Sequence, residues 1–221
     1  MEQVFLRANS DAQKKIRVQQ ILNQAIALYD EGGYDKINFA RIARSLNFTR
    51  NNLYNYFHSK EEIFLEVIQR GTEDLLQDFR DALSSITPGS EKEFIQAWVR
   101  VISRHSRLIE LYSLMNVDIL PYISHDSHSL FQSRQDQMYF QIAKLVKHAI
   151  PALSDETAVR FCLYEIHYAM ALMPISRRFH QSGVRSDIDP GDFSIVYGQF
   201  LETLLEGLKA QERKQHHSDS K

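Results

Sequence analysis

Side chains that can bond to the edges and phosphates of DNA are concentrated between Thr49 and Tyr56. Asn pairs with the edge of adenine, and Arg with the edge of guanine, in the major groove. Thr and Tyr hydroxyl groups are among those that hold phosphate oxygens. Asn is also a poor residue for an exposed helix that only meets water, so three Asn in one short stretch favour a binding surface. The residue types therefore predict contact with nucleic acid; a small helical surface that is merely hydrated is the alternative.

The expected contacts come from this stretch and from two flanking positions. The predicted DNA-binding residues are Asn38, Thr49, Arg50, Asn51, Asn52, Tyr54, Asn55, Tyr56 and Lys60. Within this set, Arg50 and Asn51 are expected to read bases. Tyr54 and Lys60 are expected to hold phosphates and so to act on all DNA sequences alike.

Two short helices joined by a turn must position these side chains. The apolar residues of the first helix share helical spacing: Phe39, Ile42, Ala43 and Leu46. Asn47 then marks a turn, because Asn tolerates the left-handed backbone that a turn without Gly requires. Thr49 is placed to cap the second helix by accepting a hydrogen bond from the amide of Asn52.

The second helix is expected to bury Leu53 and Phe57 and to leave its polar residues outward. Ser59 and Glu62 stand at the spacing of a capping box, which predicts that a longer helix starts at Lys60. A short helix, a turn and a second helix with a polar face are the parts of a helix-turn-helix.

The stretch from about Lys14 to Val67 resembles the N-terminal DNA-binding domain of the TetR family of bacterial transcriptional regulators. The residues that carry the resemblance are Tyr29-Asp30-Glu31-Gly32-Gly33-Tyr34, Ile42-Ala43, Leu53-Tyr54-Asn55-Tyr56-Phe57 and Ser59-Lys60-Glu61-Glu62. Two positions depart from the family pattern, because Asn47 and Asn51 stand where Gly is common. The Asn51 side chain either crowds the DNA groove or supplies an additional base contact. The resemblance implies a dimeric DNA-binding protein with an inducer cavity in its second domain.

Composition places further limits on the chain. Of its 221 residues, 43% are hydrophobic and 24% charged, as in an ordinary globular protein. The formal net charge is −2, so a basic surface for nucleic acid has to be local. The residues expected to form it are Arg41, Arg44, Arg50 and Lys60. Lys14, Lys15 and Arg17, at the start of the first helix, either reach a phosphate backbone or form a hydrated face, and the sequence does not decide between these.

Cysteine usage and the N-terminus favour the cytoplasm. The single Cys162 excludes an internal disulfide and suits a reducing compartment. The N-terminal residues lack the basic and apolar segments of a secretory signal, and no apolar run approaches the roughly 20 residues that cross a bilayer.

The pattern after Pro88 is helical throughout, which predicts an all-α fold with an N-terminal three-helix helix-turn-helix domain and a larger helical ligand-binding and dimerisation domain. Residues 1–59 are expected to form the first domain, with a mobile arm at residues 1–12. Residues 60–213 are expected to form the second domain, in which residues 60–86 are a connecting helix. Residues 214–221 are expected to be a disordered tail.

The last helix and the outer face of the helix before it are expected to form the interface of a homodimer. Its apolar residues cover more than one face, and Gly198 is expected to allow close approach of a second copy. The alternative is that the apolar stripe packs entirely within one subunit.

Soft and aromatic side chains between Trp98 and Phe179 suggest a pocket for a mostly apolar small molecule, although most of them are expected to be core. The predicted ligand-binding residues are Tyr112, Met115, Tyr139, His167, Met170 and Arg177. His125 and His128 are expected in a hydrated loop, so no metal site and no cofactor are predicted.

These expectations together predict a transcriptional regulator rather than an enzyme. The predicted regulator is a ligand-responsive repressor that binds a palindromic operator in double-stranded DNA as a homodimer, with no membrane partner. A helical protein-binding adaptor and an enzyme of unknown type are the alternatives, and salt-dependent binding to a palindromic duplex separates them from a regulator.

Overall fold

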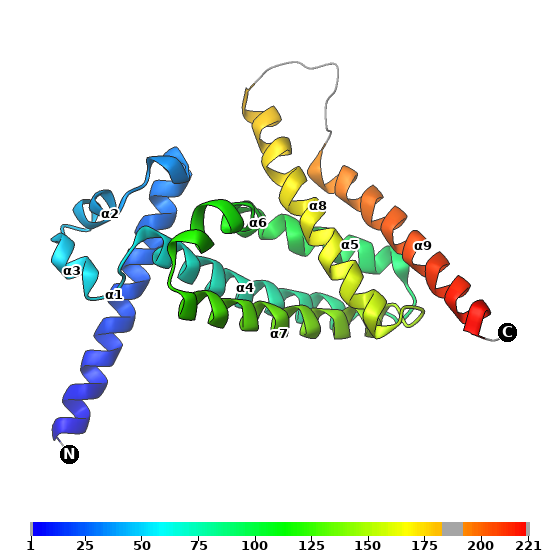
Figure 1. Ribbon diagram of the computed structural model, residues 1–221, viewed down its shortest axis with the longest axis horizontal. Helices are drawn as coiled ribbons and strands as arrows, with labels where there is room; N and C mark the ends of the chain where they lie inside the picture. Colours follow the sequence, from blue (N-terminus) through cyan, green and yellow to red (C-terminus); the bar gives the residue numbers. More distant parts are fainter. Residues whose placement is uncertain (1, 183–191, 220–221) are drawn as a thin grey trace. The chain divides into compact units, whose positions relative to one another are not determined.

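The computed structural model describes the backbone of residues 2–182 and 192–219, and the side chains of residues 11–176 and 192–214. All regular structure in these ranges is helical, and no strand occurs in them (Figure 1). The predicted all-α fold is therefore confirmed. The chain divides into an N-terminal unit, residues 1–70 with 116–125, and a C-terminal unit, residues 71–115 with 126–221.

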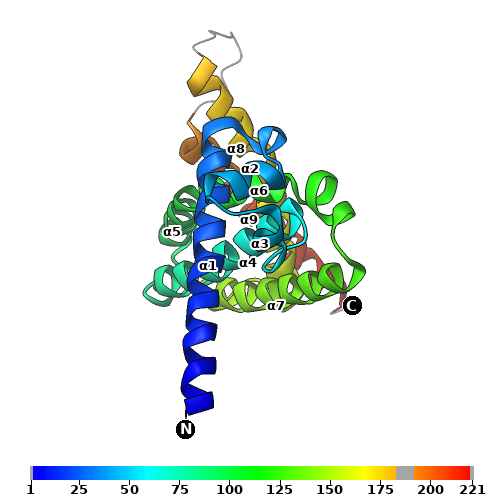
Figure 2. The ribbon, with the colours of Figure 1, turned by 90° about the vertical axis from the view of Figure 1, so that its left-hand side faces the viewer.

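The N-terminal unit is built from short helices packed beside a long one. Its elements are α1 (Glu2–Gly32), the 3-10 helix η1 (Tyr34–Lys36), α2 (Phe39–Ser45), α3 (Arg50–Tyr54) and the start of α4 (Lys60–Ser84). α2 packs against α1 and against α3, and all three helices face the viewer in Figure 2. The buried apolar residues that hold these elements together include Ile21, Leu22, Ala25, Ile37, Ile42, Leu53, Phe57, Ile63 and Phe64.

A segment far along the sequence completes this unit. It contains the end of a π-helix (Met115–Ile119) and a 3-10 helix (Leu120–Tyr122). The hydroxyl of Tyr34 donates a hydrogen bond of 3.2 Å to the backbone carbonyl of Asp118, and Ile119 is completely buried. The connection between α6 (Ser106–Ser113) and α7 (His125–Ala149) is thus part of the core around α1 and α4.

The turn between α2 and α3 has the geometry expected from its Asn. Asn47 has a φ of 55°, a left-handed conformation that Asn tolerates better than most residues. The amide of Phe48 donates to the carbonyl of Ala43 at 2.8 Å, and the amide of Asn47 to that of Arg44 at 3.1 Å. This pair of bonds is a Schellman motif, which ends α2 and redirects the chain into α3.

The ends of the chain differ from the sequence prediction. α1 begins at Glu2, so residues 2–12 are helical rather than an irregular arm. α9 (Phe193–Asp219) likewise continues beyond Lys214, where a disordered tail was expected. Extending an existing helix costs far less than starting one, and each segment contains residues that favour helix, such as Glu2, Gln3 and Arg7 in the first and Lys214 and Gln215 in the second.

The C-terminal unit contains the rest of α4 and five further α-helices. They are α5 (Glu91–Arg104), α6 (Ser106–Ser113), α7 (His125–Ala149), α8 (Asp155–Ser182) and α9. α8 lies beside α6 and α9, and α5 also packs on α9 (Figure 1). The side chains of Phe79, Phe94, Trp98 and Phe161 meet at the centre, with ring centroids of neighbouring pairs 4.2 to 5.6 Å apart.

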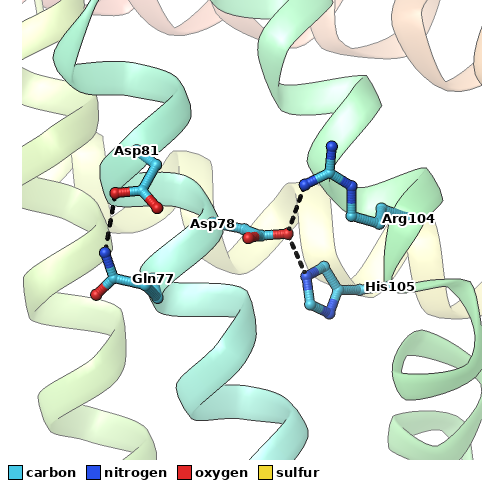
Figure 3. Close-up of polar contacts among 5 residues, drawn as sticks. All are labelled: Gln77, Asp78, Asp81, Arg104 and His105. Atoms are coloured by element: carbon cyan, nitrogen blue, oxygen red, sulfur yellow. Dashed lines mark hydrogen bonds and ion pairs between the residues drawn. The ribbon is translucent and has the colours of Figure 1, made fainter.

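An ion-pair cluster ties α4 to the corner between α5 and α6 (Figure 3). One carboxylate oxygen of Asp78 lies 3.0 Å from Arg104 Nη1 and 3.0 Å from His105 Nε2. The hydrogen bonds with His105 and Arg104 hold the pKa of Asp78 below its ordinary value, although its partial burial acts in the opposite direction. The cluster fixes the point at which α5 ends and α6 begins.

The described residues include neither a group of metal ligands nor a helix that could span a membrane. His125 and His128 are exposed, as expected, but they lie in the first turn of α7 rather than in a loop. Among the described residues, no three His, Cys, Asp or Glu side chains are grouped as metal ligands would be. Within the same part of the chain, every helix is too short or too polar to span a bilayer.

Replacing Asn47 by valine is expected to lower the free energy of unfolding by about 1–2 kcal/mol, because a β-branched residue resists the left-handed conformation. The matched control Asn47→Gly should retain wild-type stability or exceed it, since glycine adopts this conformation freely. Urea denaturation followed by circular dichroism measures both. A valine variant as stable as the wild type would show that the turn has another backbone geometry in solution.

Candidate functional site

The outward surface of α3 displays most of the residues predicted to contact DNA. Arg50, Asn51, Asn52 and Asn55 are exposed, whereas Leu53 on the opposite side is completely buried. The first three of these polar residues belong to α3, and Asn55 follows at its C-terminal end. Leu53 is the buried residue that packs α3 against the core. An α-helix presenting donors and acceptors in this way fits the width of the major groove.

Two of the predicted contact residues are helix caps. The hydroxyl oxygen of Thr49 accepts a hydrogen bond of 3.1 Å from the amide of Asn52, as the sequence predicted. The side-chain oxygen of Asn38 accepts one of 2.8 Å from the amide of Arg41 and so begins α2. The Thr49 hydroxyl proton and the Asn38 amide protons are not consumed by these caps, so both residues keep donors for phosphate.

Tyr54 and Lys60 are supported by aromatic rings. Tyr54 is 47% exposed, and its ring centroid lies 4.8 Å from that of Phe39. The amino group of Lys60 sits 4.0 Å from the centre of the Tyr34 ring, in the arrangement of a cation–π contact. Burial and the neighbouring Glu61 carboxylate raise the pKa of Tyr34, so its ring remains neutral beneath the Lys60 charge.

An open groove of about 650 Å³ runs between α1 and the end of α3. Its lining residues are Gln13, Lys14, Ile16, Arg17, Gln20, Asn55 and Tyr56. The two glutamines were not singled out from the sequence, although their helical spacing from Lys14 and Arg17 places all four on one face of α1. The groove joins the α1 cations to two residues of the predicted DNA-binding set.

The basic residues near α3 have different surroundings. The guanidinium of Arg41 bonds to the carboxylate of Glu31 at 2.9 Å and to the carbonyl of Lys36 at 3.1 Å, so its charge is largely matched inside the unit. Arg44 and Arg50 are exposed. The structure therefore favours Arg44, Arg50 and Lys60 over Arg41 as the local basic surface.

A second candidate site lies within the C-terminal unit, where five helices converge on a small cavity. It is lined by Leu75, Phe79, Ile102, Tyr112, Met138, Tyr139, Ile142, Cys162, Glu165 and Ile166. Its free volume is about 10 Å³, enough for about one water molecule. We call it the Glu165 cavity, because the Glu165 carboxyl is the most polar group in a mostly apolar lining.

Glu165 belongs to a fully buried chain of hydrogen bonds. Trp98 Nε1 donates to the hydroxyl of Tyr197 at 3.2 Å, and that hydroxyl donates to Glu165 Oε2. Burial raises the pKa of Glu165 to about 8, although the hydrogen bonds from Tyr197 and Trp98 oppose this shift. Glu165 was not among the predicted ligand-binding residues; its signal in the sequence is a single acidic residue on an apolar stripe that also contains Phe161 and Cys162.

Tyr112 lies on another side of the cavity, where its hydroxyl is held by two polar neighbours. It is 2.5 Å from the Thr72 hydroxyl and accepts a hydrogen bond of 3.2 Å from Gln135 Nε2. Desolvation raises the pKa of Tyr112, which keeps its hydroxyl protonated.

The predicted ligand-binding residues are only partly brought together. Tyr112 and Tyr139 line the cavity, and Met115 is buried outside the lining. His167 is exposed and Met170 half-buried, so neither belongs to this cavity. The side chain of Arg177 lies outside the described residues.

Gly198 does not have the position that the dimer prediction gave it. A Cβ atom at Gly198 would lie 3.7 Å from Val99 Cγ2, so this glycine faces α5 of its own chain. Tyr197, Leu201 and Leu205 are also buried within the chain, which means that much of the apolar stripe of α9 is core. Periodicity alone could not separate these two roles, since core and interface residues have the same spacing.

The helix-turn-helix of α2 and α3, followed by a separate helical unit, is an arrangement typical of DNA-binding proteins. Residues 21–67 match the family of bacterial regulatory proteins called tetR, and residues 69–212 match the tetracyclin repressor-like C-terminal domain. The chain therefore belongs to the TetR family of transcriptional regulators, and as a member it is a DNA-binding protein.

Solved structures of the same fold extend over most of the chain. A TetR/AcrR-family regulator from Thermobifida fusca is 20% identical, with a TM-score of 0.52 and coverage of 87% of this chain and 96% of its own. A possible TetR-family regulator from Streptomyces coelicolor is 15% identical, with a TM-score of 0.59 and coverage of 87% and 98%. The regulator PfmR from Thermus thermophilus is 20% identical, with a TM-score of 0.56 and coverage of 85% and 98%. No curated protein matches the chain.

Glu165→Gln is expected to remove a pH dependence of stability. The folded protein keeps the Glu165 proton up to about pH 8, whereas the unfolded chain releases it near the ordinary value of 4.5. The folded state therefore binds more protons in this window, and stability falls as pH rises through it, by up to a few kcal/mol.

Melting temperatures between pH 5 and pH 8 measure the effect, with the exposed Glu202→Gln on α9 as the control for the chemical change. The Glu165→Gln profile should be flatter than that of the wild type, and the Glu202→Gln profile should follow the wild type. Parallel wild-type and Glu165→Gln profiles would mean that the carboxyl is ionised in the folded protein.

Proposed function

We propose that this regulator is a cytoplasmic repressor that binds a palindromic operator as a homodimer and releases it when a small molecule binds. The observation that carries the proposal is the exposed polar surface of α3, with Arg50, Asn51 and Asn52 outward and Leu53 buried behind them. A single short helix reads few base pairs. Two copies related by a two-fold axis read two half-sites, about 34–36 Å or a multiple of that distance apart.

The groove beside α1 supports contacts that flank each half-site. Lys14 and Arg17 line it together with Asn55 and Tyr56, so cations lie next to the end of the reading helix. In this proposal they take the phosphate-binding role that the sequence left open, whereas α3 supplies the base contacts.

An exposed apolar stripe on α8 supports the dimer. Tyr164, Tyr168, Ala171 and Ile175 recur at helical spacing; Tyr164 is 48% and Ile175 47% exposed. The Tyr168 ring stacks on Phe200 of α9 at 3.8 Å between centroids, which joins the stripe to the neighbouring helix. Two such helices from each subunit would bury the stripe in a four-helix interface.

Ligand release is supported by the position of the Glu165 cavity. Helices α4 to α8 all contribute to its lining, and the first residues of α4 belong to the N-terminal unit. A ligand there would favour a dimer in which the separation of the two α3 helices no longer fits successive major grooves.

Selection of bound duplexes from a random pool tests the function. The expected product is an inverted repeat, bound with an affinity that falls steeply as salt rises. Recovery of no common motif, or binding that does not depend on salt, would contradict the proposal.

Arg50→Ala and Asn51→Ala are expected to relax the preference at individual base pairs, at a cost of about 1–3 kcal/mol for the preferred base. Lys60→Ala and Tyr54→Phe should instead weaken binding to all duplexes, and Lys60→Ala should lower the salt slope by about one. Repeating the selection and titrating salt distinguishes the two classes. Arg41→Ala is the charge-matched control and should have little effect on the salt slope, since Arg41 is already paired with Glu31. An unchanged base preference in the Arg50→Ala and Asn51→Ala variants would refute the assignment of these two residues to base contacts.

Ile175→Asp is expected to dissociate the dimer, because it places a charge in the centre of the proposed interface. Phe140→Asp is the control, since Phe140 is also an exposed apolar residue, at 60%, but belongs to α7 and not to the α8 stripe. Sedimentation velocity measures both. A wild-type monomer, or a dimer that survives Ile175→Asp, would count against this interface.

A further inference from the structure

We propose that the Glu165 cavity recognises a compact organic cation, with the Glu165 carboxylate as its counter-ion and the surrounding aromatic rings as its walls. The inference rests on the proposed ligand response and specifies the chemical class of the ligand. It follows from the position of the carboxyl, from the residues around it and from the packing of the helices.

The carboxyl is held in a fixed place. Glu165 is 4% exposed, and Tyr197 donates to its Oε2 from one side. Tyr197 is in turn fixed by the hydrogen bond from Trp98, and both of these residues are completely buried. A carboxyl anchored through one oxygen at the wall of a cavity is preorganised to meet a ligand with its remaining polar surface.

The lining favours a positive charge over the other possibilities. Phe79, Tyr112 and Tyr139 contribute aromatic rings, which attract cations through their faces. None of the residues that line the cavity in the described part of the chain is basic. An anion would therefore meet a carboxyl without a compensating charge, and a neutral hydrocarbon would gain nothing from it.

Binding must be accompanied by the release of a proton. In the empty cavity, burial keeps Glu165 protonated, because its pKa is raised to about 8. When a permanent cation enters, the carboxyl proton passes to solvent and the resulting carboxylate pairs with the ligand, so the buried charge sums to zero. As pH increases toward 8, the cation affinity is therefore expected to rise by roughly tenfold for each pH unit.

Because the cavity is small, binding of an organic cation requires a rearrangement of the residues around it. Free space of about 10 Å³ accommodates about one water molecule, so an organic cation has to displace lining side chains. Met138 is the most adaptable of these, since its thioether chain is flexible. Because protein interiors are close-packed, the rest of the expansion has to move helices that meet at the cavity, including α4.

Three probes of similar size and different charge test the proposal on the full chain: benzyltrimethylammonium, its uncharged carbon isostere neopentylbenzene, and the anion phenylacetate. Calorimetry and thermal shift should show at least tenfold tighter binding of the cation. Titrations at pH 7 in buffers with different ionisation heats should show release of about one proton per cation bound. These measurements need no variant and so do not depend on the folding of one.

Glu165→Gln supplies the second arm, because the amide keeps the shape of the side chain and an oxygen for Tyr197 but cannot become charged. It should lose the preference for the cation and the proton release, while the exposed Glu202→Gln keeps both. Circular dichroism confirms that each variant is folded before binding is measured.

Equal binding of the three probes, or tighter binding of the anion, would overturn the cation assignment and leave a ligand-responsive regulator in place. Binding of none of them would also overturn it. The duplex selection does not involve these probes, so failure of DNA recognition is detected separately.

Discussion

The exposed polar surface of α3 depends on the burial of one leucine. α3 has five helical residues, far fewer than an isolated helix needs to be stable in water. Leu53 is completely buried against the core of the N-terminal unit, and Thr49 caps the helix in front of it. This packing fixes the backbone of the helix and therefore the positions from which its exposed Arg and Asn side chains project.

The two units differ in where they place their polar groups. The N-terminal unit exposes hydrogen-bonding groups and keeps its few cations at the surface, which suits a charged and hydrated partner. The C-terminal unit instead hides polar groups in pairs and chains, as with Trp98, Tyr197 and Glu165. Buried polar groups of this kind are costly unless they are satisfied, so they set a specific arrangement of helices.

α4 and the segment from Asn116 to His125 are the two places where the chain passes between these units. The first contributes residues to both, and the second contributes Asp118 and Ile119 to the core around Tyr34. A change in the packing around the Glu165 cavity acts directly on α4, whose side chains Leu75 and Phe79 line it. The proposed coupling between ligand and DNA therefore requires no contact beyond the continuity of the chain and the packing of its core.

Local signals in the sequence were enough to predict the helix-turn-helix. The left-handed Asn47, the Thr49 cap and the inward Leu53 are each set by bonds or contacts within a few residues, and all are present in the structure. The regular apolar spacing likewise predicted the all-helical fold, because it follows from the geometry of a single helix. The same kind of reasoning failed at the chain ends, where propagation of a helix outweighs local polarity.

Only the tertiary structure decided which side chains meet across helices. The pairing of Arg41 with Glu31, the direction of Gly198 toward Val99 and the hydrogen bond from Tyr197 to the buried Glu165 involve residues far apart in the sequence or on different helices. An apolar stripe has the same spacing whether it faces its own core or a second subunit, so its partner could not be read from periodicity. The sequence by itself determined the local elements and the polar face of α3, because short-range bonds specify them; the surroundings of each charge were determined by packing, because burial depends on the whole chain.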